Sequence, residues 1–73
     1  MNQSKYKVFV MMLKDETMLY KFYETPRTIK QLKAYNKRLI SEKHFNYIEC
    51  ISSISAFLDR YNWDYIKECG KQI

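Results

Sequence analysis

Glycine, proline and histidine are almost absent from this sequence, whose 73 residues include one of each and only two cysteines. Because Gly70 is the only glycine, the chain has no glycine-rich loop that could cradle a phosphate. Cys50 and Cys69 show neither CxxC nor Cys/His spacing, so the common zinc motifs are excluded and at most one internal disulfide is available. We therefore expect no metal and no cofactor.

Long apolar runs are also missing. The longest uncharged stretch, residues 50–58, has nine residues, whereas a membrane-spanning helix needs about 20. The first residues lack an apolar segment followed by a small-residue cleavage site. We expect a cytoplasmic protein without membrane contact, in which both cysteines are reduced and buried as small apolar residues. A Cys50–Cys69 disulfide is the alternative.

Catalytic constellations are not evident. Catalysis requires a nucleophile, base or metal that is held by a second group. His44 falls between two expected elements, where a histidine is usually a surface residue, and Asp59 and Glu68 have basic neighbours, Arg60 and Lys67. The seven tyrosines are typical of packing and interfaces. We expect a protein that is not an enzyme, with no catalytic residue and no small-molecule substrate.

Apolar residues are plentiful, and their order predicts the fold. The chain is 47% hydrophobic and 16% aromatic, which indicates one compact domain over residues 1–73. Residues 5–13 are rich in β-branched, aromatic and long apolar side chains, residues 18–23 are again mostly apolar or aromatic, and the polar cluster between them predicts a β-hairpin. A loop of two or four residues places Leu13 opposite Met18. The same register sets Met11 opposite Tyr20 and Phe9 opposite Phe22.

Successive side chains of a strand point to opposite faces, so this register sorts the hairpin into two apolar faces. One face carries Phe9, Met11, Leu13, Met18, Tyr20 and Phe22. The other carries Tyr6, Val8, Val10, Met12, Leu19 and Tyr23, interrupted only by Lys21.

Thr25 and Pro26 are a typical helix start, and a helix is expected over residues 26–41. Apolar residues lie on one side at helical spacing: Ile29, Leu32, Tyr35, Leu39 and Ile40. Basic residues lie on the other side: Arg27, Lys30, Lys33, Lys37 and Arg38.

A second helix is expected over residues 47–61, after an N-cap at Asn46 with Glu49 in the capping-box position. The serines at 52, 53 and 55 disfavour a helix, which leaves a short strand over 47–52 as the alternative. Residues 63–69 resemble a last strand that stops at Gly70. The predicted order is ββααβ: an α+β domain whose three-stranded antiparallel or mixed sheet has two helices packed on one face.

Two helices on one face would leave the other face of the hairpin in water. An apolar patch of this kind usually marks an interaction surface, so a homodimer or a protein partner is expected on Tyr6, Val8, Val10, Met12, Leu19 and Tyr23. In one alternative the second helix crosses to this face and completes a three-layer core, and in another the face is simply exposed.

Positive charge is concentrated on the first predicted helix. Residues 26–43 carry six lysines or arginines and one acid, Glu42, so this segment alone has the net charge of +5 that the whole chain has. Such a stripe contacts an acidic protein, contacts nucleic acid, or only solubilises the domain. If this helix entered a major groove, Gln31 and Asn36 could contact base edges.

The hairpin resembles a known family. Lys7-Val8-Phe9-Val10-Met11 and Lys14-Asp15-Glu16-Thr17-Met18 are similar to the opening of the small T-even phage antitoxins that neutralise a host RNase toxin, and Glu68-Cys69-Gly70 resembles their end. The resemblance implies a small phage or mobile-element protein that acts by occluding a larger host protein. A non-enzymatic, dimeric binding module of this kind is the leading hypothesis, and a small nucleic-acid-binding protein is the alternative.

Overall fold

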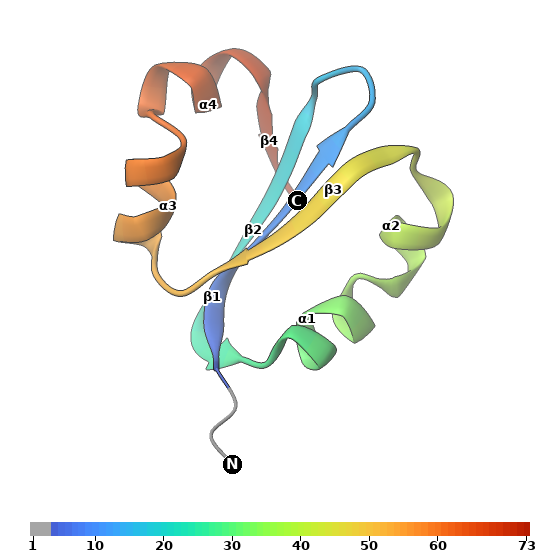
Figure 1. Cartoon of the computed structure of the whole chain (residues 1–73), viewed down its shortest axis with the longest axis vertical. Coiled ribbons are helices and arrows are strands. Elements are labelled where there is room, and N and C mark those ends of the chain that lie inside the picture. The colour runs from blue at the N-terminus through green and yellow to red at the C-terminus, as the bar shows by residue number, and fades with distance from the viewer. Residues whose placement is uncertain (1–3) are drawn as a thin grey trace.

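A computed structural model describes residues 4–73 as a four-stranded mixed sheet with two helices on each face (Figure 1). In chain order the elements are β1 (Tyr6–Leu13), β2 (Met18–Arg27), α1 (Ile29–Tyr35), α2 (Lys37–Glu42), β3 (Phe45–Ile51), α3 (Ile54–Arg60), α4 (Trp63–Cys69) and β4 (Gly70–Gln72). The strand order is β3-β1-β2-β4; β1 is antiparallel to β2 and β3, and β4 is parallel to β2. The α+β class is confirmed, whereas three strands with helices on one face is wrong.

The hairpin of β1 and β2 is confirmed, but its predicted register is wrong by one residue. Leu13 N–H donates to the carbonyl of Thr17 at 2.8 Å, which closes a three-residue loop. The last loop residue, Glu16, has φ 72°, the left-handed conformation that such loops require at this position. Because the loop is odd in length, Met12 rather than Leu13 lies opposite Met18.

This shift exchanges the two faces of β2, because neighbouring strand residues point to opposite sides. One core, called the first core, joins Val8, Val10, Met12, Met18 and Tyr20 to Ile51, Phe57, Tyr61 and Ile66. The second core joins Phe9, Met11 and Leu19 to Leu32, with Leu39 and Ile40 packed against it. Helices α3 and α4 therefore cover one face of the sheet, and α1 and α2 cover the other (Figure 1).

The first predicted helix begins later than expected and is divided in two. Strand β2 continues through Arg27, so Thr28 is the N-cap, and it forms a capping box with Gln31. At Asn36 the backbone leaves helical geometry, and its side-chain amide donates to the carbonyl of Leu32 at 2.8 Å. A short polar side chain that bonds the nearby backbone favours such a break.

Residues 47–61 are not a single helix, and the alternative strand is confirmed as part of β3. Ser53 accepts a hydrogen bond from the N–H of Ala56 at 3.0 Å and caps α3. The predicted strand over residues 63–69 is wrong as well, because Asn62 caps a helix there, α4, by accepting from the N–H of Tyr65. The last strand is β4 instead.

Candidate interaction surfaces

The six residues expected to form an exposed apolar interface do not form one. Val8 and Val10 are fully buried, and Met12 and Leu19 are 7% and 6% exposed. Leu19 lies in the second core and the other three in the first core, so they occupy opposite faces of the sheet. Tyr6 and Tyr23 are half-buried against the second core. Because one copy of the chain encloses both faces, the expectation of an apolar sheet face that needs a companion is wrong.

The predicted basic residues lie together on α1, α2 and the end of β2, a surface that we call the basic layer: Arg27, Lys30, Lys33, Lys37 and Arg38. All but the half-buried Arg27 are exposed. Arg38 pairs with Glu42 at 2.9 Å, across one helical turn. Lys30, Lys33 and Lys37 take part in none of the ion pairs found within residues 4–73. Their charges are therefore free to attract an acidic partner.

Both residues proposed for reading bases accept or donate hydrogen bonds within the fold. Asn36 is only 7% exposed, and its amide is hydrogen-bonded to Leu32 and to the hydroxyl of Tyr23. Gln31 is exposed, but its side-chain oxygen accepts from the N–H of Thr28 in the capping box. Since Asn36 also ends α1 after seven residues, the basic layer lacks one continuous recognition helix.

Exposed apolar side chains accompany the lysines of the basic layer. Ile29 and Tyr35, both predicted for the apolar side of the first helix, are 42% and 53% exposed. The ring of Tyr35 packs on that of Tyr23 with centroids 6.0 Å apart, so its orientation is fixed by contact with β2. Tyrosine and arginine, here Tyr35 and Arg38, are the residue types of this surface that are enriched at protein interfaces. A chemically mixed surface of this kind suits a protein partner.

A polar cluster that sequence reasoning did not find joins β3 to α3. Arg60 Nε lies 2.8 Å from one carboxylate oxygen of Glu49, and the Tyr61 hydroxyl donates to the other oxygen at 2.8 Å. The hydroxyl of Tyr47 lies 3.0 Å from that of Tyr61. Burial, together with the bonds to Tyr47 and Glu49, raises the pKa of Tyr61 well above its usual value. The cluster links β3 to α3, and Glu49 is a strand residue rather than a helix cap.

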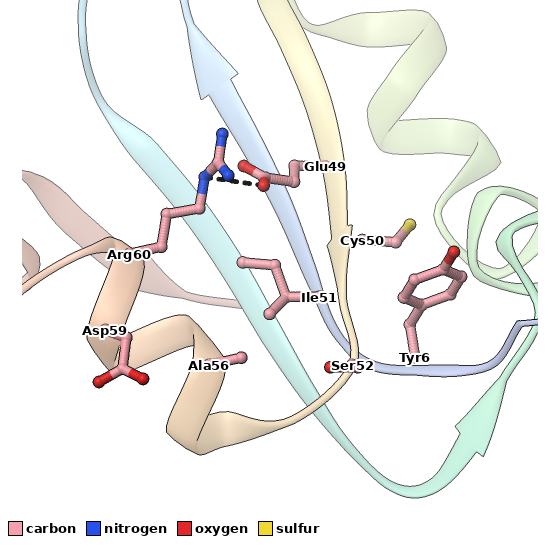
Figure 2. A pocket seen from close by; sticks show the side chains of 8 residues that line it. All are labelled: Tyr6, Glu49, Cys50, Ile51, Ser52, Ala56, Asp59 and Arg60. Atoms are coloured by element: carbon pink, nitrogen blue, oxygen red, sulfur yellow. Dashed lines mark ion pairs between the residues drawn. The ribbon is translucent and has the colours of Figure 1, made fainter.

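A shallow hollow of about 530 Å³, the β3 hollow, lies where β3 leads into α3 (Figure 2). Cys50 and Tyr6 line it from one side of the strand, and Glu49 and Arg60 from the other. Burial raises the pKa of the Cys50 thiol, which favours its neutral form. Cys50 and Cys69 are both free and pack against different cores, so the sheet separates the two sulfurs.

Other classes of site receive no support within residues 4–73. No three or more His, Cys, Asp or Glu side chains gather there in a way that suits a metal ion. In the same range, no helix has the length and apolar character needed to cross a bilayer.

Comparisons of the chain with protein-family models, curated proteins and solved structures give no match.

Proposed function

We propose that this protein is a non-enzymatic binding module that docks its basic layer on an acidic surface of a larger protein and acts by occluding that surface. The observation that carries the proposal is the location of the charge. The whole net charge of +5 belongs to residues 26–43, and this segment forms one face of the molecule. Opposite potentials on two surfaces accelerate their encounter and select the partner.

A protein partner is favoured over nucleic acid by two features of the basic layer. Ile29 and Tyr35 add exposed apolar area on the same helix as Lys30 and Lys33, which phosphate binding does not need. Asn36 and Gln31, the amides available for reading bases, are engaged within the fold. The resemblance of the hairpin to phage antitoxins agrees with occlusion, although that hairpin forms the buried centre of the sheet.

The test is affinity capture from cells of the native source, with three matched baits. The first bait is the wild-type protein. The second carries Lys30→Glu, Lys33→Glu and Lys37→Glu. The third carries the same number of reversals at exposed lysines outside the basic layer, at Lys14, Lys67 and Lys71, so both variants have equal net charge. Nuclease treatment of each lysate separates protein partners from nucleic acid.

We expect one protein to be captured by the wild type and by the control variant, and to be lost with the basic-layer variant. Nuclease treatment should leave this capture unchanged. Equal capture by all three baits would show that the basic layer is not the docking surface. Capture that disappears with nuclease would favour nucleic acid as the ligand instead.

A further inference from the structure

A second hollow, called the α1 hollow, lies where the start of β1 meets α1. It has a volume of about 390 Å³ and is lined by Ser4, Tyr6, Thr28, Ile29 and Lys30. Tyr6 also lines the β3 hollow, so the two hollows adjoin at this residue. Sites for whole small molecules usually measure about 300–1,000 Å³. The α1 hollow is near the lower limit of this range, a size that suits one side chain of a partner.

The lining of the α1 hollow combines apolar surface with positive charge. Ile29 is 42% exposed, and Tyr6 is half-buried against the second core. Lys30 is the one charged residue in the lining, which contains no acid. The lining of the β3 hollow, in contrast, includes the acids Glu49 and Asp59. The α1 hollow therefore fits an apolar group that has negative charge next to it.

Two further cations belong to the surroundings of the α1 hollow. Arg27 on β2 is the direct partner of Tyr6 on β1, so both side chains point to the same face of the sheet. Lys33 follows Ile29 by four residues on α1, a spacing that places both on one side of the helix. The charge of Lys33 also reaches Cys50 on β3, where it opposes the effect of burial on the pKa of the thiol. Neither cation belongs to an ion pair within residues 4–73.

We propose that the α1 hollow takes one bulky apolar side chain from an acidic segment of the partner, while carboxylates beside that side chain pair with Arg27, Lys30 and Lys33. This inference rests on the proposed function and names the feature that the basic layer recognises. A few apolar anchors supply much of the binding energy at protein interfaces, and charges around them select the partner. A nucleic acid backbone would supply the negative charge but not the apolar side chain.

Two labelled peptides of equal length and charge test the apolar contact. Both consist of aspartate and glutamate, except that one has a leucine at its centre and the other a serine. Fluorescence anisotropy gives their dissociation constants for the wild type, for Ile29→Ser and for Leu58→Ser. Leu58 is the matched control, because it is 39% exposed and lies on α3, at the opposite face of the sheet. Both replaced side chains are exposed, so all three proteins should fold.

We expect the wild type and Leu58→Ser to bind the leucine peptide about tenfold more tightly than the serine peptide, because part of the leucine side chain leaves water. Ile29→Ser should bind both peptides equally, with the affinity that the wild type has for the serine peptide. The proposal is overturned if the wild type binds both peptides equally or binds neither. A preference for leucine that persists in Ile29→Ser would also overturn it.

The variant with Lys30→Glu, Lys33→Glu and Lys37→Glu separates this proposal from the proposed function. If the wild type binds both peptides equally and this variant binds neither, only the apolar contact is wrong and the basic layer remains the docking surface. Peptide binding that the three reversals leave unchanged would overturn both proposals. An oligonucleotide of the same charge that binds the wild type more tightly than the leucine peptide would also overturn both, in favour of nucleic acid.

Discussion

The side-chain amide of Asn36 donates a hydrogen bond of 3.0 Å to the hydroxyl of Tyr23, and so ties the junction of α1 and α2 to strand β2. The same amide bonds the carbonyl of Leu32 at 2.8 Å. The basic layer is thus held on the sheet by a part-buried polar contact as well as by the apolar contacts of Leu32, Leu39 and Ile40. The junction of the two short helices that carry the lysines is anchored to the sheet as a result.

Replacing Asn36 with alanine should destabilise the fold by about 1–3 kcal/mol, because polar groups in a partly buried site lose their partner. Urea unfolding followed by circular dichroism measures the free energy of unfolding. Asn46→Ala is the control, since Asn46 is exposed and should cost less than about 0.5 kcal/mol. Equal losses in the two variants would contradict the structural role of the Asn36 contact.

Leu19 tests whether one chain buries both faces of its hairpin. Leu19→Ala should cost about 2–5 kcal/mol, because it leaves a cavity in the second core. Leu58 on α3 has the same side chain but is 39% exposed, so Leu58→Ala should cost much less. Thermal or urea unfolding of both variants measures the two losses in stability. A Leu19→Ala protein as stable as Leu58→Ala would indicate that the Leu19 face is open to solvent.

Gly70 lies at the end of α4, where a methyl group has no room. An added Cβ would sit 2.6 Å from the carbonyl oxygen of Ile66 and 3.1 Å from side-chain carbons of Met18 and Tyr20. Gly70→Ala should therefore lower the free energy of unfolding by about 1–3 kcal/mol. Lys71→Ala, one residue further on at an exposed position, is the control and should change little. No loss in Gly70→Ala would mean that β4 does not dock against β2 as described.

Tyr61 should make the fold sensitive to alkaline pH. Its pKa is raised in the folded protein above the ordinary value of 10.0, so the folded state holds the phenol proton more tightly than the unfolded state does. The resulting stabilisation is complete below pH 10 and is lost as the pH rises further. In Tyr61→Phe, stability should fall less steeply above about pH 10 than in the wild type. Parallel pH profiles for the two proteins would contradict the hydrogen-bonded cluster of Tyr61, Tyr47 and Glu49.

Alternating and helical patterns in the sequence were sufficient to predict the hairpin and the inward positions Leu32, Leu39 and Ile40. These patterns did not predict the register of the hairpin, because no local pattern indicated that Glu16 adopts a left-handed conformation in a three-residue loop. The conformation of Glu16 sets the register of the hairpin and therefore which side chains of β2 share a face with those of β1. The wrong register led to the wrong expectation of an exposed apolar face.

The second half of the chain was harder because short segments fit two structures. Residues 47–51 have helical spacing when read together with 54–61, yet they form β3 because the serines at 52 and 53 separate them from α3. In α4, Trp63, Ile66 and Cys69 are spaced three apart, a helical signal that the aromatic content of the segment concealed. The basic layer could be located because charge is visible without knowing the register.

The most direct test of the basic layer as docking surface is to map the backbone amide signals of the protein by NMR while the captured partner is added. We predict that signals of α1, α2 and the end of β2 shift or broaden, and that those of α3 and α4 stay in place. Changes confined to α3 and α4, with the basic layer unaffected, would contradict the account.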